Sequence, residues 1–308
     1  MSENPEQPAS PTSSPAPKAD FSHLYNQPGP RPYFAALKPL EYRIPQPALA
    51  FVNRILDTFP RDDGKPRKVL DVCCSYGINA ALLRHDLSFD DLTLHYESTS
   101  DLTSYEEQVV VDKQFFASRL SSSRQDLQVI GLDLAPNAIR YATDTGLLTP
   151  GGAGGFAEDL EAAPPSDDLR AALRDVGLVV CTGGVGYVGA PTFGRIAAAS
   201  ARPGDLWMVA FVLRIYPFDE TIGAELRRFG LVADKIPGVV FKQRRFVSPE
   251  EQRAAVATVR ARGMHPAGVD EESGWYYAEC FVVHPAETDA GRNPVDVAGL
   301  FSGLTTLG

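Results

Sequence analysis

The chain has 308 residues, of which 44% are hydrophobic and 22% are charged, and its formal net charge is −10. This balance is typical of a globular protein, and the acidic excess argues against a general nucleic-acid surface. No apolar run approaches the length of a membrane span, and the first residues do not resemble a secretory signal. We therefore expect a cytoplasmic protein without a membrane partner.

Cysteine and histidine are sparse in this sequence. Four cysteines stand at positions 73, 74, 181 and 280, and five histidines are scattered along the chain. Because no CxxC pair or Cys/His cluster has the spacing of a zinc site, we expect no bound metal. Free thiols are typical of the cytosol.

The composition changes along the chain and divides it into four parts. The first is rich in proline, serine and alanine, and the second is aromatic, broken by prolines, and ends in a stretch with an apolar helical face, PALAFVNRILDTF. The expected parts are a disordered tail (1–20), an aromatic lid with a helix (21–66), an α/β domain (67–285) with insertions at about 87–125 and 214–247, and a C-terminal tail (286–308).

Strands alternate with helices through the α/β part. The runs RKVLDVCC and LQVIGLDL are expected to be buried parallel strands, each followed by a helix, and further strand-like runs occupy 176–182, 205–216 and 274–284. In SPEEQRAAVATVRARG, Ser248 can cap a helix and Glu251 can complete a capping box. This alternation predicts a parallel α/β sheet with a crevice at the carboxyl ends of its strands.

Polar residues stand where successive strands are expected to end. Asp71 follows the first strand, Asp133 ends the second, Glu158 and Asp159 follow the third, and Cys181 ends the fourth. An acid at the second strand can accept both hydroxyls of a ribose, and an acid at the third could accept the amine of adenine. The G-x-G-x-x-G pattern of dinucleotide sites is missing after the first strand, which argues against NAD.

This series resembles the class I S-adenosylmethionine (SAM)-dependent methyltransferases over about residues 67–285. The strongest match is VIGLDLAPNAIRYA, in which an acid, a turn, a proline and an amphipathic helix follow in the order that ribose binding needs. The resemblance implies a Rossmann-like α/β fold with a mostly parallel seven-stranded sheet, helices on both faces and a helical insertion after the first helix. It also implies SAM as the cosubstrate.

The first loop departs from the family pattern. The usual pattern is acid-x-Gly-x-Gly-x-Gly, and here the three glycine positions hold Cys73, Ser75 and Gly77. Side chains at the first two positions are expected to narrow the space for the methionyl part of SAM. The resemblance implies that the following residues bind SAM: Asp71, Cys73, Ser75, Gly77, Asp133, Leu134, Glu158, Asp159, Leu160 and Cys181.

The aromatic lid, the two insertions and the loop after the fourth strand supply the remaining candidates, because such segments build substrate pockets in this kind of fold. Tyr187 and His95 are the catalytic candidates, although each could also be an ordinary wall or surface residue. Arg244 and Arg245 are expected to lie at a solvated hairpin tip rather than to form an anion clamp. The substrate-binding candidates are Tyr33, Tyr42, Tyr96, Arg214 and Tyr216.

Three functions remain open. The first is methyl transfer from SAM to an O, N or C nucleophile of a small-molecule metabolite, for which no catalytic base is evident in the sequence. The second is a SAM cyclase or lyase, in which the SAM amine attacks its own Cγ to give azetidine-2-carboxylate and methylthioadenosine. The third is SAM binding without turnover. The sequence indicates neither the acceptor nor the oligomeric state.

Overall fold

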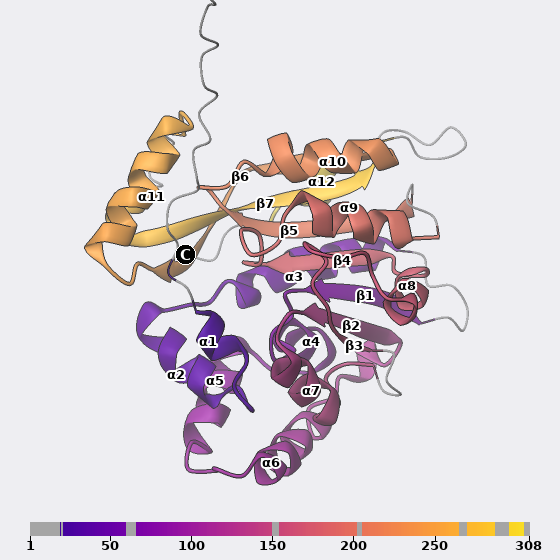
Figure 1. Ribbon diagram of the computed structural model, residues 1–308, viewed down its shortest axis with the longest axis vertical. Helices are drawn as coiled ribbons and strands as arrows, with labels where there is room; N and C mark the ends of the chain where they lie inside the picture. The colour runs from indigo at the N-terminus through magenta and orange to yellow at the C-terminus, as the bar shows by residue number, and fades with distance from the viewer. Residues whose placement is uncertain are drawn as a thin grey trace, which may run out of the picture.

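A seven-stranded sheet forms the centre of the molecule (Figure 1). The computed structural model describes residues 19, 21–59, 66–149, 154–201, 205–264, 270–286 and 296–304. The strand order is β3-β2-β1-β4-β5-β7-β6; β1 to β5 are parallel, and β7 runs antiparallel between β5 and β6. The strands are β1 (Arg67–Val72), β2 (Leu127–Asp133), β3 (Gly155–Ala157), β4 (Leu178–Thr182), β5 (Trp207–Leu213), β6 (Leu231–Arg245) and β7 (Trp275–Pro285).

Helices cover both faces of this sheet. On one face, residues of α3, α4 and α7 share a buried apolar cluster with Val69 and Val129; on the other, residues of α8, α9 and α10 share a second cluster with Leu70 and Ile130. Since successive strand residues point to opposite faces, β1 and β2 must be apolar on both, which explains their continuous apolar runs. The bounds are α3 (Pro45–Thr58), α4 (Ile78–Arg84), α7 (Pro136–Asp144), α8 (Asp167–Leu173), α9 (Ala190–Ala199) and α10 (Ala224–Leu226). The expected α/β fold is confirmed.

The expected helical insertion after the first helix of the α/β part is also present. Helices α5 (Phe89–Ser98) and α6 (Tyr105–Ala117) and the short 3₁₀ helix η2 (Ser122–Arg124) lie between α4 and β2. Helix α5 begins with a complete capping box between Ser88 and Asp91. In the part of the chain that the structure describes, no helix has the length and apolar character needed to cross a membrane.

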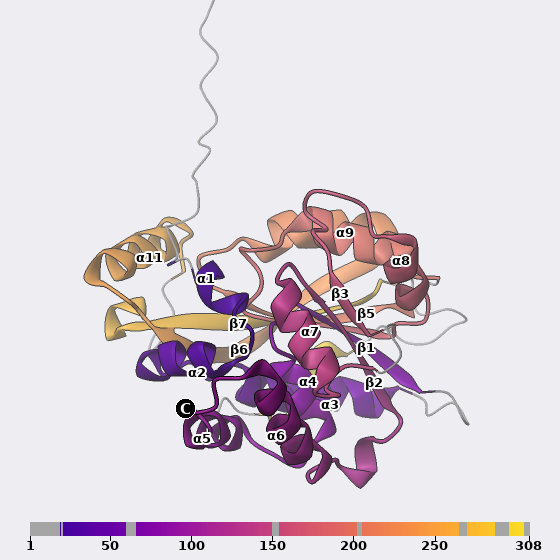
Figure 2. The ribbon, with the colours of Figure 1, turned by 60° about the horizontal axis from the view of Figure 1, so that its bottom comes forward.

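Residues 21–44, the N-terminal segment, lie beside this insertion. The segment contains α1 (Ser22–Tyr25), α2 (Arg31–Leu37) and the 3₁₀ helix η1 (Lys38–Leu40). Figures 1 and 2 both show α2 next to α5. A contact between Phe34 and Tyr96, with ring centroids 4.6 Å apart, joins the two helices.

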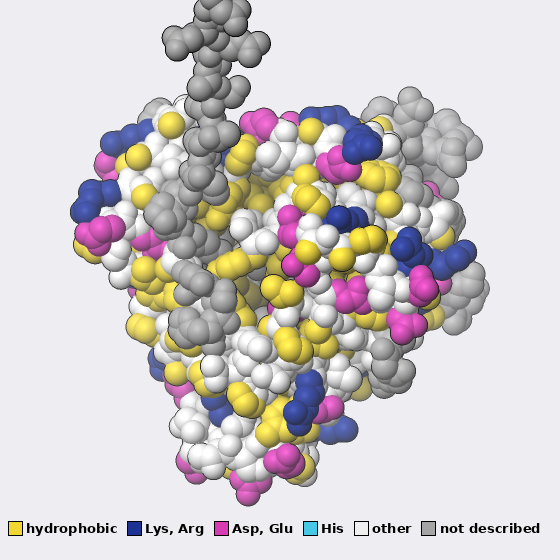
Figure 3. Space-filling view, viewed as in Figure 1, with side chains coloured by type: hydrophobic (Ala, Val, Ile, Leu, Met, Phe, Trp, Pro, Cys, Tyr) yellow, Lys and Arg dark blue, Asp and Glu magenta, His cyan; other side chains and the backbone are white. Residues whose placement is uncertain are grey.

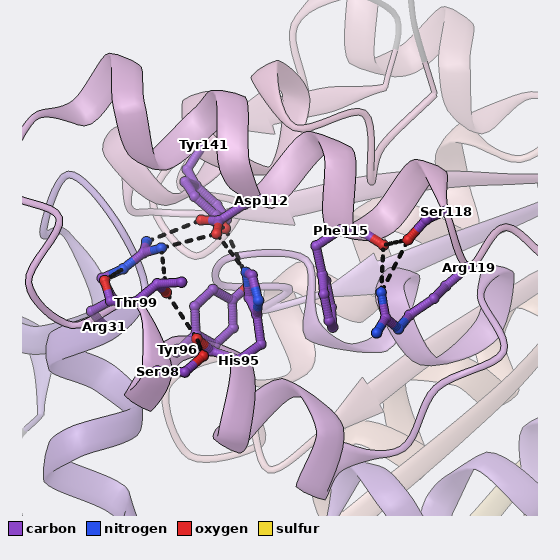
Figure 4. A network of polar contacts seen from close by, with 10 residues as sticks. All are labelled: Arg31, His95, Tyr96, Ser98, Thr99, Asp112, Phe115, Ser118, Arg119 and Tyr141. Atoms are coloured by element: carbon purple, nitrogen blue, oxygen red, sulfur yellow. Dashed lines mark hydrogen bonds and ion pairs between the residues drawn. The ribbon is translucent and has the colours of Figure 1, made fainter.

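A buried polar network fixes the same junction (Figure 4). The carboxylate of Asp112, on α6, is fully buried and accepts two hydrogen bonds from the Arg31 guanidinium, at 2.9 and 3.0 Å. The Tyr141 hydroxyl donates to it at 2.7 Å, and His95 Nε2 lies 2.7 Å from its other oxygen. Burial alone would raise the pKa of Asp112, but the hydrogen bonds from His95, Arg31 and Tyr141 outweigh burial and lower it. The network therefore joins α2, α5, α6 and α7 through one charged group.

The segment after β5 is built from regular elements. Most of 214–247, expected as an insertion, consists of the helices η4 (Asp219–Gly223), α10 and η5 (Arg227–Phe229) and then the edge strand β6. Helix α11 (Pro249–Ala261) follows and begins where expected, since Ser248 Oγ accepts from the Glu251 N–H at 3.2 Å. Glu251 pairs with Arg244 instead of completing a capping box.

Both expected tails fall largely outside the described residues. Of 1–20, only Ala19 is described, and its N–H donates to Glu251 at 2.9 Å. Within 286–308, the structure describes 286 and 296–304, which contain α12 (Val297–Leu300). Phe301 stacks on Phe51 of α3, with ring centroids 5.3 Å apart. The C-terminal helix thus covers part of the α3 face.

Candidate functional site

A cavity of about 290 Å³ lies at the carboxyl ends of β1, β2 and β4. The loops after these strands line one side of it, and residues of the N-terminal segment line the other. Its volume is close to the lower limit of small-ligand sites, which span roughly 300–1,000 Å³. Seven residues singled out in the sequence line it: Cys73, Ser75, Asp133, Leu134, Tyr33, Tyr42 and Tyr187.

The loop after β1 has the left-handed backbone that glycine usually adopts, although two of the three family glycine positions hold other residues. Cys73 and Ser75 have positive φ angles of 58° and 49°, and Gly77, with a φ of 79°, precedes α4. The left-handed conformation costs a residue with a side chain about 1–2 kcal/mol, and such strain gathers at functional sites. The Ser75 hydroxyl is buried and has no hydrogen-bond partner. Both the strain and the unpaired hydroxyl indicate a loop shaped for a ligand.

Replacing Ser75 by glycine is expected to raise the free energy of unfolding by about 1 kcal/mol, because relief of the left-handed strain exceeds the entropy that glycine adds to the unfolded chain. Denaturant titration measures this gain. Ser75→Ala is the matched control, since it removes the hydroxyl and keeps the Cβ atom. A glycine variant no more stable than the alanine variant would contradict the strained-loop interpretation.

Asp133 ends β2 and faces the same cavity. Its carboxylate accepts from the Ser75 N–H at 2.8 Å and from the Ala135 N–H at 2.9 Å, so it holds the loops after β1 and β2 together. Burial raises the pKa of Asp133 above its usual value. A carboxylate has about four acceptor positions, so these two bonds leave capacity for ligand hydroxyls.

Asp71 lies beneath the cavity and not in its lining. The side chain is fully buried, and burial raises its pKa to about 7. Asn79 Nδ2 donates to one Asp71 oxygen at 2.8 Å and to Thr182 Oγ1 at 2.9 Å, while the second Asp71 oxygen has no partner. Asn79 and Thr182 both line the cavity. Asp71 therefore positions cavity residues through Asn79.

A pair of thiols lies at the cavity, with Cys73 in its lining and Cys181 behind it. Cys181 is buried beside the loop after β1, and a hydrogen bond between the Cys181 and Cys73 thiols, together with burial, raises the pKa of Cys73. The Cys73 thiol therefore stays protonated near neutral pH and is not a ready nucleophile. Among the described residues, no group of three or more His, Cys, Asp or Glu side chains could hold a metal ion.

Tyrosines form the wall that the N-terminal segment contributes. Tyr33 lies between Tyr25 and Tyr42, with ring centroids 5.8 and 6.3 Å away, and Tyr25 meets Tyr187 edge-on at 6.1 Å. Burial raises the pKa values of Tyr25, Tyr33 and Tyr42, so these phenols are neutral. The wall offers aromatic faces and hydroxyl groups without charge.

The predicted adenine-binding residues lie outside this lining. Glu158 accepts from the Ser166 N–H at 2.9 Å and pairs with its hydroxyl at the start of α8. Asp159 accepts from the N–H groups of the next turn, and Leu160 is buried in the core. Gly77 and Cys181 also stand behind the lining and not in it.

His95 and Tyr96 belong to the Asp112 network and do not line the cavity. Tyr96 is buried, and its hydroxyl lies 3.1 Å from that of Tyr141. The His95 ring also stacks on Phe115, with centroids 3.8 Å apart. Both side chains thus contribute to the junction between α2 and the insertion.

A second hollow, a groove of about 1310 Å³, adjoins the cavity at Tyr187, which lines both. Tyr216 lines this groove, whereas Arg214 is buried behind it in an ion pair with Glu271 at 3.0 Å. Hydrophobic side chains gather in the hollow between α11 and α10 (Figure 3). Of the two, only Tyr216 faces open space.

Sequence reasoning missed the contribution of β6 to the cavity. Gln243 and Arg244 both line it, and both side chains are 2% exposed. Arg244 forms a buried ion pair with Glu251 at 2.6 Å, so the expectation of a solvated hairpin tip was wrong for this residue. The alternation of Val239, Phe241 and Gln243 was the signal that could have placed Gln243 on the inner face of a strand.

Among known proteins, the chain is similar to several solved structures. No family model and no curated protein matches the chain. It is similar to the CMeT domain of citrinin polyketide synthase (9% identity, TM-score 0.38, covering 78% of this chain and 52% of that one). It is also similar to the plantazolicin methyltransferase BpumL in complex with SAH, with 10% identity and a TM-score of 0.34, over 86% of this chain and 88% of that one. A third similar structure is a cyclopropane-fatty-acyl-phospholipid synthase-like protein from Lactobacillus casei, with 13% identity and a TM-score of 0.37, over 88% of this chain and 94% of that one.

The chain spans about half the length of the citrinin synthase structure, 52%. At such low identity and TM-score, these similarities carry no argument about activity. The strand order and the position of the cavity at the strand ends come from this chain itself. On that basis the chain has a Rossmann-like α/β fold with a mostly parallel seven-stranded sheet and helices on both faces.

Proposed function

We propose that the protein binds SAM in the cavity at the ends of β1, β2 and β4 and transfers its methyl group to a small molecule. The observation that carries this proposal is the pairing of Asp133 with the strained loop after β1, at 2.8 Å, on the edge of the cavity. Asp133 is suited to the ribose hydroxyls, and the loop to the methionyl arm.

The aromatic wall of the cavity is suited to a cationic ligand. The sulfonium of SAM carries a positive charge, and the faces of Tyr25, Tyr33 and Tyr42 attract cations while excluding water. SAM supplies an activated methyl group: the nucleophile forms a bond to the methyl carbon, the bond to sulfur breaks, and S-adenosylhomocysteine and a proton are released. The protein has chiefly to align the two partners.

The groove beyond Tyr187 is the route by which we propose the acceptor arrives. Tyr187 lines both hollows, so its side chain stands between SAM and the acceptor. The groove mixes apolar residues such as Val188 and Phe281 with charged ones such as Glu279 and Lys235. This lining suits a small amphipathic metabolite better than an extended polymer.

SAM cyclisation is the second candidate, and the scarcity of bases in the cavity lining favours it. Among the described residues, Asp133 is the single carboxylate in its lining, and the phenols there are neutral, which gives an acceptor little base assistance. In cyclisation the α-amine bonds to Cγ, the Cγ–S bond breaks, and azetidine-2-carboxylate, methylthioadenosine and a proton are formed. SAM binding without turnover is the third candidate.

Incubation of the purified protein with SAM alone, followed by chromatography of the nucleosides, distinguishes these functions. Methyl transfer predicts no product until an acceptor is added, and then S-adenosylhomocysteine. Cyclisation predicts methylthioadenosine from SAM alone. In that case Ser75→Gly should lower methylthioadenosine formation far more than SAM binding. Without the Ser75 side chain beside it, the methionyl arm of SAM is less constrained and bends less readily. No SAM binding at all by calorimetry would refute every candidate.

A further inference from the structure

Gln243 lies at an irregularity of β6, on the face of the strand that also carries Val239 and Phe241. Strand β6 pairs with β7 through Lys242 and Tyr277 and then through Arg244 and Tyr276, so β6 has one more residue than its partner between the two pairs. Gln243 is that extra residue. The alternation of β6 turns Gln243 inward, where the residue is 2% exposed and lines the cavity, and the bulge leaves the adjacent Arg244 in the lining as well.

Two other parts of the chain approach this residue. The backbone carbonyl of Gln243 accepts from the Arg43 N–H at 3.2 Å, which joins the bulge to the residue after Tyr42. At the end of β4, a Cβ atom added to Gly183 would lie 2.9 Å from Gln243 Nε2 and 3.6 Å from the Tyr42 hydroxyl. Because Gly183 has no side chain, it leaves room for the Gln243 amide, and the Tyr42 hydroxyl lies near the same position.

The Gln243 amide has an acceptor atom without a partner. Its Oε1 is buried and makes no hydrogen bond in the structure. A buried carbonyl oxygen without a donor is destabilising, and native proteins rarely keep one without a functional reason. Because this oxygen belongs to a residue in the cavity lining, the missing donor is to be sought on a ligand.

The order of the strands indicates which ligand group that donor is. Asp133, at β2, is the proposed ribose ligand; Cys73 and Ser75, at β1, come next; and Gln243 lies over Gly183, at β4. A ligand whose ribose lies at β2 and whose arm crosses β1 places the end of the arm near Gln243. In SAM, that end carries an ammonium group with three N–H donors.

We propose that Gln243 binds the α-ammonium of the methionyl arm through its Oε1 atom. The inference rests on the proposed SAM binding and applies to methyl transfer and cyclisation alike. It gives the edge strand β6 a direct part in recognising the amino-acid end of SAM.

Titration calorimetry of three variants with two ligands tests this role. Gln243→Leu should weaken SAM binding at least tenfold and leave the affinity for methylthioadenosine, which lacks the amino-acid arm, within twofold. Gln243→Glu should bind SAM within a few-fold of the unaltered protein, because a carboxylate also accepts from an ammonium. Gln125→Leu makes the same chemical change at an exposed residue and should alter neither affinity.

Equal weakening for both ligands in Gln243→Leu, or unchanged SAM affinity, would overturn the assignment. So would a greater loss in Gln243→Glu than in Gln243→Leu, since the ligand would then present its carboxylate to this residue. If the leucine variant does not fold, Gln243→Asn, with its amide one methylene shorter, decides the question with the same two ligands and limits. Failure of the unaltered protein to bind either nucleoside would instead refute the proposed function, and with it this role.

Discussion

Asp112→Ala is expected to lower the free energy of unfolding by about 3–5 kcal/mol, the usual cost of removing one partner from a buried ion pair. The variant leaves the Arg31 guanidinium, 8% exposed, without its carboxylate and removes the acceptor for the Tyr141 hydroxyl. Urea titration measures the loss, and Asp101→Ala, at an exposed residue, is the control.

Two further measurements separate the ion pair from general damage. The double variant Arg31→Ala/Asp112→Ala should lose less than the sum of the single variants, because no charge is then left buried. The pKa of Asp112 is lower in the folded protein than in the unfolded chain. Its contribution to the free energy of unfolding is therefore complete above the unfolded carboxyl pKa of about 3.9 and falls as the pH drops through the lower folded pKa. Strict additivity, or a loss of stability no larger than that of the control, would contradict the role of the network.

Asp133→Ala is expected to weaken SAM binding by about 1.5–3 kcal/mol, the scale of a hydrogen bond to a charged group, or roughly tenfold to 150-fold in Kd. The variant also takes the shared acceptor from the Ser75 and Ala135 N–H groups, so the two loops lose their link. Calorimetric titration measures the change. Asp133→Asn, which keeps one acceptor oxygen, should lose less, and unchanged affinity in the alanine variant would refute the ribose assignment.

The sequence predicted the features that depend on neighbouring residues. The apolar runs of β1 and β2 and the helix starting at Pro136 follow from hydrophobic periodicity and local backbone preferences. The Ser248 cap of α11 is equally local, because its bond spans three residues. From these elements alone, strand ends carrying Asp71 and Asp133 could be expected to meet at one edge of the sheet.

The tertiary structure decided which side chains meet there. Gln243 and Arg244, although adjacent, both enter the lining because β6 has one residue more than β7 between their flanking pairs, and no local pattern specifies that pairing. His95 meets Asp112 across 17 residues of chain, and Arg31 meets the same carboxylate across 81, so the place of His95 in a buried network could not be read from its neighbours. Local preferences determine helices and strands, whereas the partners of a buried polar group depend on how those elements pack.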